Sequence, residues 1–253
     1  ELGSEEVLSP ELAKLKEQVP EVKRLVKDFN CPIFELAGFE ADDLIGTLVK
    51  KIRSETPNLN IYIITGDMDT LQLVDEKTKV YTSKRGLTDT VIYDPASVLT
   101  RYGFGPDKVL DYKALRGDPS DNIPGVKGIG EKTATELVKK FGSLENIYQN
   151  YADSDFSDRI KSLLNEGKET AFLSKELVTL DLNAPIDFNL SLCSFADNYD
   201  REKVFSLFRE FEFTSLLKKI PLSKPKPKTL QMNFDSEPAR EIKAHILSML
   251  ARK

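Results

Sequence analysis

The sequence of 253 residues contains no tryptophan, one histidine and two cysteines. His245 has no companion ligand near it in the sequence, and we assign it no catalytic role. Cys31 and Cys193 are far apart and do not form a metal-binding spacing, and we expect no disulfide between them. The sequence therefore offers neither a thiol–imidazole metal site nor a disulfide framework.

Long hydrophobic runs are also missing. No apolar stretch approaches the roughly 18 residues that a membrane span needs, and no signal-peptide pattern opens the chain. Hydrophobic residues make up 40% of the chain and charged residues 30%, which is typical of a soluble globular protein. We expect a cytoplasmic protein of one or two domains without a membrane partner.

The chain lacks the net positive charge of many nucleic-acid-binding proteins. Its net charge is −5, yet residues 218–253 carry nine Lys or Arg against three Asp or Glu. Electrostatic steering depends on local patches rather than on the total charge. The acidic balance therefore does not exclude DNA as a partner.

The first hundred residues alternate between helical and strand patterns. Ser9-Pro10 begins a helix, and Pro20 is expected to end it and start a second. Cys31–Leu36 is expected to form a short strand, and residues 40–53 a helix. Asn60–Thr65 is a continuous apolar run, typical of a strand buried on both faces. This alternation predicts an α/β core with a parallel sheet.

The rest of the chain is mostly helical. Residues 79–82 and 90–93 favour a hairpin at the sheet edge, and residues 106–180 have helical patterns throughout. We expect four regions. Residues 1–105 form a partial core, and residues 106–180 form a helical region. Residues 181–220 form C-terminal helices that pack on the core, and residues 221–253 form a Pro/Lys linker followed by an amphipathic helix.

Three groups of carboxylates stand out: Glu40, Asp42 and Asp43; Asp67 and Asp69; Asp118 and Asp121. The first group opens a helix, where acidic residues also favour the helix dipole, but three in four positions exceed what a cap needs. The second group follows the carboxyl end of the strand at residues 60–65, where ligands bind in open α/β sheets.

All seven carboxylates would need cations if they shared one pocket. Two like charges about 4 Å apart repel by roughly 4 kcal/mol at an effective dielectric constant of 20. Oxygen ligands without His or Cys select Mg²⁺ or Mn²⁺ rather than Zn²⁺. Two such ions would support phosphodiester hydrolysis, whereas the alternative is a set of scattered surface acids.

A glycine-rich turn follows the third group and opens a helix at Glu131. Glycines allow another backbone to approach closely, and a helix N-terminus favours phosphate. The alternative is a purely structural helix–turn–helix corner. The candidate DNA-binding residues are those of the turn and the lysine that follows it: Gly125, Val126, Lys127, Gly128, Ile129, Gly130 and Lys132.

The segment GDPSDNIPGVKGIGEKTA at residues 117–134 closely resembles the helix–three-turn–helix of the 5′-nuclease (flap endonuclease) domain of bacterial DNA polymerase I. The resemblance continues through residues 39–43, 65–69 and 171–177 and covers about residues 9–219. It implies a PIN-like core with all seven carboxylates as catalytic metal ligands. It also implies a hairpin that grips duplex DNA, in the family often through a K⁺ ion, and 5′-flap, nicked or branched DNA as substrate.

The sequence departs from this family in two ways. Met68 stands where many members carry Lys. The family begins with a strand that ends in a metal-binding Asp, followed by a basic arch. We expect this sequence to lack both, because residues 9–29 resemble the helices after that arch. We therefore expect a chain that binds DNA but cuts it poorly alone.

Several alternatives and partners stay open. The runner-up function is a non-catalytic DNA-structure-binding module of the same fold, and a PIN-type ribonuclease is the third. A polymerase domain is a possible C-terminal neighbour in the native protein. Gln231–Phe234 is similar to a sliding-clamp-binding peptide but is one residue short.

Overall fold

The computed structural model describes residues 10–85, 89–193 and 199–220. The Pro/Lys linker, the terminal amphipathic helix and the clamp-like peptide lie outside the described residues. The described residues form two compact units, one within residues 34–188 and one that combines residues 10–33 with residues 189–193 and 199–220. The units are described separately.

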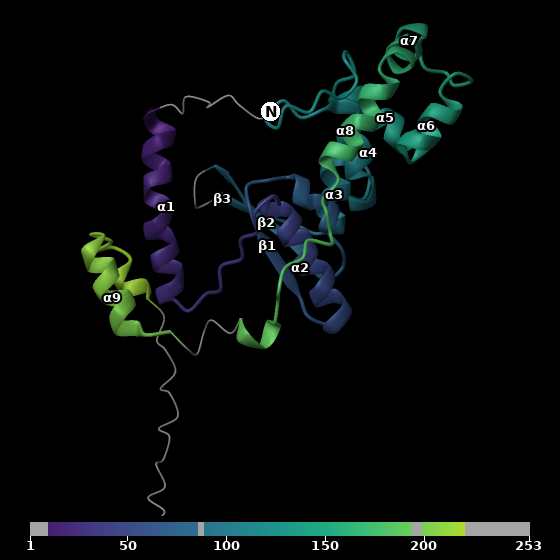
Figure 1. The fold of residues 1–253 in the computed structure, drawn as a ribbon. Coiled ribbons are helices and arrows are strands. Elements are labelled where there is room, and N and C mark those ends of the chain that lie inside the picture. Colours follow the sequence, from purple (N-terminus) through teal and green to yellow (C-terminus); the bar gives the residue numbers. More distant parts are fainter. Residues whose placement is uncertain (1–9, 86–88, 194–198, 221–253) are drawn as a thin grey trace, which may run out of the picture. The chain divides into compact units, whose positions relative to one another are not determined.

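The unit of residues 34–188 contains a small sheet and seven helices among its described residues (Figure 1). Short 3₁₀ turns at Asp69–Leu73 and Pro106–Lys108 connect some of its elements. The helices and strands are α2 (Ala41–Glu55), β1 (Ile61–Ile64), β2 (Thr78–Arg85), β3 (Asp89–Tyr93), α3 (Pro95–Tyr102), α4 (Val109–Arg116), α5 (Glu131–Phe141), α6 (Leu144–Asn150), α7 (Asp158–Glu166) and α8 (Lys168–Val178).

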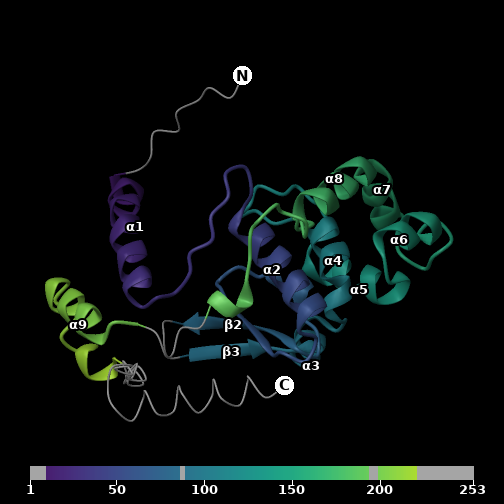
Figure 2. The same cartoon turned by 60° about the horizontal axis from the view of Figure 1, so that its bottom comes forward.

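The sheet has the strand order β1-β2-β3. β1 pairs with β2 in parallel, and β2 pairs with β3 antiparallel, so the predicted parallel pairing and edge hairpin are both confirmed. α2 lies against one face of the sheet (Figure 2), where Val49 joins Ile63 and Val80 in one cluster.

The prediction that β1 is buried on both faces is wrong. Ile63 is 5% exposed, whereas Tyr62 is 54% and Ile64 79% exposed. Successive side chains of a strand point to opposite faces, so Ile63 faces α2 and its neighbours point away from it. Within this unit, the described elements bury only the face that carries Ile63.

One hydrophobic core joins the sheet to the helical region. The same cluster contains Leu71 from the turn after β1, Leu115 from α4, Leu137 from α5 and Leu164 from α7, all with no exposed surface. Burying each such side chain contributes about 1.5–3 kcal/mol. Because α4 and the turn Asp69–Leu73 share this core, the loop after α4 is held beside the carboxyl end of β1.

A buried polar network fixes α4 further. The carboxylate of Asp111, 5% exposed, accepts hydrogen bonds from the Leu144 backbone N–H at 2.9 Å and from Lys175 Nζ at 2.8 Å. Lys175 also donates to Glu145 at 2.8 Å. Burial alone lowers the pKa of Lys175, but the hydrogen bonds to both carboxylates outweigh burial and raise it. The network ties α4, α6 and α8 together.

The second unit packs α1 (Pro10–Asp28) against α9 (Arg201–Glu210). Arg24 bonds both carboxylate oxygens of Glu210, at 2.7 and 2.8 Å. The expected restart at Pro20 is wrong because one helix runs through it. Proline removes one helical hydrogen bond, and Pro20 is exposed, so water can solvate the carbonyl that is left without a partner.

Two further expectations concern extended structure and membranes. Cys31–Leu36 forms no strand, so that prediction is also wrong. Pro32 has no N–H to donate, and no described strand pairs with the segment. Among the described residues, the structure contains no helix with the length and apolar character of a bilayer span.

Candidate active site

The first carboxylate group lies at the start of α2, where Glu40 is the residue before the first helical turn. Asp43 accepts a hydrogen bond from the Glu40 backbone N–H at 3.2 Å through one oxygen. Its other oxygen accepts from the Asp181 backbone N–H at 2.8 Å. Asp43 thus closes the helix start and anchors the segment that follows α8.

The second group follows β1 directly. The Asp67 backbone N–H donates to Thr65 Oγ1 at 3.0 Å, and Asp67 Oδ1 accepts from the Asp69 backbone N–H at 2.8 Å. These two bonds form a tight turn at the carboxyl end of the strand. The turn directs Asp67 and Asp69 toward different neighbours.

Asp67 lies next to Asp42 of the first group. The pKa of Asp42 is raised to about 6, first by burial and then by the charge of Asp67 and a hydrogen bond shared with it. Glu40 and Asp43 raise it further through their charges. A bound cation would stabilise the ionised form of a carboxyl group that other carboxylates surround in this way.

We expect Asp42→Asn to stabilise the metal-free protein by about 1–2 kcal/mol at pH 7.5, a value reduced for partial exposure. The folded-state pKa of about 6 lies above the ordinary 3.8, so ionised Asp42 destabilises the fold fully above pH 6. This penalty disappears as the pH falls toward 4, where wild type and variant should be equally stable. Urea denaturation in EDTA at both pH values, with Asp153→Asn as control, measures the difference. A stabilisation that persists at pH 4 would contradict this cause.

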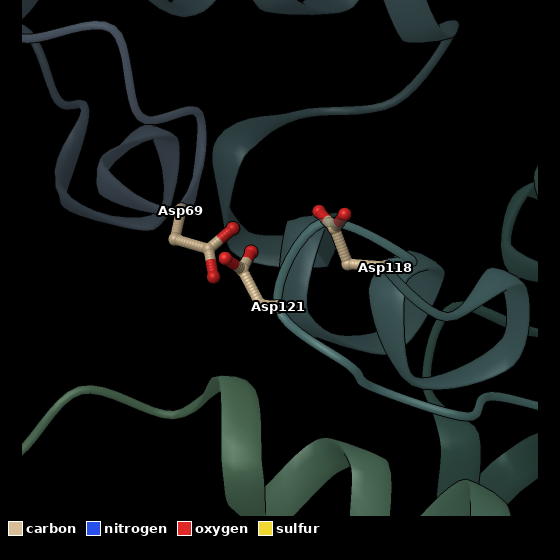
Figure 3. A group of neighbouring side chains, drawn as sticks. All are labelled: Asp69, Asp118 and Asp121. Atoms are coloured by element: carbon tan, nitrogen blue, oxygen red, sulfur yellow. The ribbon is translucent and has the colours of Figure 1, made fainter. Parts of the chain in front are cut away.

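Asp69 belongs to a second cluster with Asp118 and Asp121. One oxygen from each of the three carboxylates lies within 4.8 Å of the other two. Asp69 and Asp121 point toward one another, and Asp118 lies on the same loop as Asp121 (Figure 3). We call Asp69, Asp118 and Asp121 the carboxylate trio.

The loop that carries two members of the trio is held by its own backbone. Asp118 and Ile123 form an isolated bridge in which each backbone N–H donates to the other's carbonyl, at 3.0 and 2.9 Å. Asp118 Oδ1 accepts from the Ser120 backbone N–H at 3.1 Å and from Ser120 Oγ at 2.6 Å. Burial raises the pKa of Asp118, but the hydrogen bonds from Ser120 and Lys113 outweigh burial and lower it.

The trio suits a divalent cation. Oxygens that share one Mg²⁺ at about 2.0–2.1 Å lie roughly 3–4 Å apart, so only a small contraction of the trio would be needed. Among the described residues, the trio is the one group of at least three possible ligands with such close spacing. The seven sequence-selected carboxylates therefore divide into the trio, the Asp42–Asp67 pair, and Glu40 with Asp43 at the helix start.

Lys113 is a site residue that sequence reasoning missed. Its side chain is 8% exposed, and its ammonium forms ion pairs with Asp69 and with Asp118, the latter at 3.0 Å. The signal was a lysine in α4 that Tyr112 precedes and the apolar pair Ala114-Leu115 follows. A lysine is almost never fully buried unless it is paired.

Two hydrogen bonds from its backbone hold the glycine-rich turn that begins at Gly125. The Gly125 backbone N–H donates to the buried Ser174 Oγ at 2.9 Å, and the Val126 N–H donates to the Leu115 carbonyl at 2.8 Å. Val126 and Ile129 are buried, so their side chains serve packing. Ser174 was also missed as an anchor, although it lies in one of the segments that carry the family resemblance.

The outer rim of the turn faces solvent. Lys127, Gly128, Gly130 and Lys132 are exposed, and Gly130 immediately precedes the first residue of α5. Gly128 has a φ of +90°, and no atom lies within 4 Å of a Cβ placed on Gly130. A phosphate can therefore approach the N-terminus of α5 between two lysines.

Comparisons with known proteins identify the family of the chain. A family model described as "5′-3′ exonuclease, N-terminal resolvase-like domain" matches residues 9–103, and one described as "5′-3′ exonuclease, C-terminal SAM fold" matches residues 104–201. DNA polymerase I of Bacillus caldotenax is 38% identical over 92% of this chain, and that of Caldicellulosiruptor bescii is 42% identical over 83%. The chain spans only 26% and 24% of these relatives.

Solved structures share the fold. T5 5′-exonuclease with bound zinc has a TM-score of 0.58 at 20% identity, covering 85% of this chain and 73% of its own. The catalytic core of Rad2 in complex with DNA substrate has a TM-score of 0.55 at 19% identity, covering 83% and 71%. Because the two family models together match residues 9–201 without a gap, and the relatives share this region at 38–42% identity, the chain belongs to the 5′-3′ exonuclease family.

Proposed function

We propose that this chain is a structure-specific 5′-nuclease domain that hydrolyses DNA phosphodiesters at 5′ flaps and 5′ ends, in replication and repair. One observation carries the proposal: the carboxylate trio and the phosphate-accessible turn lie on one continuous segment, residues 118–132, apart from Asp69. A metal-binding cluster beside a backbone phosphate site is what DNA hydrolysis requires.

The carboxylates of the candidate site would have different roles. The trio would hold one Mg²⁺ or Mn²⁺ ion, and Asp42 with Asp67 and Glu40 would hold the other, while Asp43 positions the start of α2. Two such ions would supply an activated water and would stabilise the leaving oxygen. The link between Asp67 and Asp69, a hydrogen bond of 2.8 Å, keeps the two groups adjacent.

The turn would hold duplex DNA by its backbone. Gly128 and Gly130 let a phosphate approach backbone N–H groups, and Lys127 and Lys132 supply charge. A K⁺ ion at the carbonyls of the turn would extend the same contact. Since the relatives are named DNA polymerase I and the chain spans only about a quarter of their length, we also propose that a polymerase domain adjoins this region in the native protein.

A non-catalytic DNA-structure-binding module is the second candidate. One observation favours it: both oxygens of Asp118 and both oxygens of Asp43 already accept hydrogen bonds from the protein. Carboxylates used in this way bind a metal ion less readily. The two candidates differ in whether bound DNA is cut.

Cleavage of labelled DNA separates the candidates. The chain is incubated at matched DNA occupancy with a 5′-flap duplex, a nicked duplex and single-stranded RNA, in Mg²⁺, Mn²⁺ or EDTA. We expect binding of the branched duplex with only weak cleavage that depends on the metal ion, and no cleavage of the RNA. Binding without cleavage in Mn²⁺ would favour the non-catalytic module, and preference for RNA would contradict both.

A further inference from the structure

Lys113 has an unusual position for a lysine. It projects from α4 into the carboxylate trio, and its ammonium contacts two of the three members, Asp69 and Asp118. Its side chain is 8% exposed, and those of its two partners are 13% and 15% exposed. A buried ammonium with two carboxylate partners is a positive charge built into the protein.

The ammonium uses the same oxygens that a metal ion would need. Asp118 Oδ1 accepts hydrogen bonds from the backbone N–H and the hydroxyl of Ser120. Asp118 Oδ2 accepts a hydrogen bond from Lys113 Nζ at 3.0 Å. Lys113 contacts Oδ1 of Asp69. Asp121 is exposed, and no described residue donates a hydrogen bond to its carboxylate. The open side of the trio therefore lies at Asp121.

Charge and geometry determine how lysine and a divalent ion share the trio. Three carboxylates and one ammonium leave a net charge of −2, which one divalent ion neutralises. Hydrogen-bonded ammonium–oxygen pairs are about 2.7–2.9 Å long, whereas Mg²⁺ needs oxygens at about 2.0–2.1 Å. An ion that draws Asp69 and Asp118 inward must displace Lys113 from at least one of them.

We propose that Lys113 is an internal counter-cation of the trio: it holds Asp69 and Asp118 together in the metal-free protein and competes with a divalent ion for their oxygens. The inference rests on the proposed function, in which the trio binds such an ion. The flexible stem of lysine allows the ammonium to swing aside. The Asp111–Lys175 bond of 2.8 Å holds the backbone of α4 in place, so that movement stays within the side chain.

Manganese binding without DNA tests the competition. Mn²⁺ affinity and stoichiometry are measured by calorimetry for wild type, Lys113→Met and Lys113→Arg. Methionine keeps the length without the charge, and arginine restores the charge. We expect at least tenfold tighter Mn²⁺ binding in Lys113→Met, and binding within about threefold of wild type in Lys113→Arg and in the control Lys16→Met, an exposed lysine on α1.

Two further results keep the proposal testable. Equal or weaker Mn²⁺ binding in a folded Lys113→Met would overturn it. If that variant does not fold, NMR of lysine ammonium groups in the wild type replaces it: Mn²⁺ should selectively broaden, and Mg²⁺ shift, the Lys113 signal, and an unchanged signal at saturating metal refutes the competition. Failure of wild type to bind Mn²⁺ at all would instead contradict the metal site of the proposed function.

Discussion

Replacing Asp67 and Asp69 together by alanine should abolish the rise in melting temperature that Mn²⁺ produces in the wild-type protein. Ligand binding to the folded state stabilises it by mass action, and each group of carboxylates would lose one member. Cleavage of a 5′-flap duplex should fall by at least about a thousandfold, because bound metal ions supply several kcal/mol of transition-state stabilisation.

The structure supplies a matched control for this variant. Asp153 and Asp187 are exposed and belong to none of the carboxylate groups of the candidate site. Asp153→Ala with Asp187→Ala therefore removes the same charge. This control should keep the Mn²⁺ response. Differential scanning fluorimetry with a Mn²⁺ series measures both proteins, and an unchanged response in the Asp67/Asp69 variant would refute the metal assignment.

Reversing the charge of Lys127 and Lys132 should weaken duplex binding by about a hundredfold at 50 mM salt. The logarithm of the affinity falls linearly with the logarithm of the salt concentration, and removing one phosphate contact lowers that slope by about one unit. The slope should therefore decrease by about two. The effect should be the same for duplexes of different sequence, because phosphate contacts do not read bases.

Fluorescence anisotropy at several salt concentrations measures this change. Lys77→Glu with Lys139→Glu makes the same change in charge outside the turn and serves as control. An unchanged slope, or a strong dependence on base sequence, would count against the turn as the DNA contact. Gly128→Val is a poorer probe, because a Cβ there would lie 3.1 Å from a Leu163 methyl group and the φ is +90°.

Local signals predicted much of the fold. The helix expected at residues 40–53 is confirmed as α2, and the hairpin of β2 and β3 is confirmed by its register. Both depend on residues close together in the sequence. The helix break expected at Pro20 and the burial expected at Ile64 were wrong for another reason. Both depend on the residues that pack around the segment, and the periodicity of one sequence does not report these residues.

The sequence also predicted the candidate site only in part. Spacing was enough to select Asp69, Asp118 and Asp121, which the structure brings within 4.8 Å of one another. It did not reveal that Asp43 is held by two backbone N–H groups, or that Lys113 enters the trio. These roles come from the packing of α4 and of the segment after α8, and such long-range contacts leave little trace in one sequence.

The loop that carries Asp118 and Asp121 and leads into the turn is held rigidly. A Cβ on Gly125 would lie 2.3 Å from the Gly117 nitrogen, and one on Gly117 would lie 2.7 Å from the Ile123 carbonyl oxygen, so two stretches of backbone touch where side chains cannot fit. Together with the Asp118–Ile123 bridge, this contact makes residues 117–125 one stiff piece. In a DNA-cutting protein, a rigid connection between the turn that holds a phosphate and the carboxylates that bind the metal ions would fix the number of nucleotides between that phosphate and the cut. The cut site would then be counted from the end of the duplex, and a longer loop would move it by whole nucleotides.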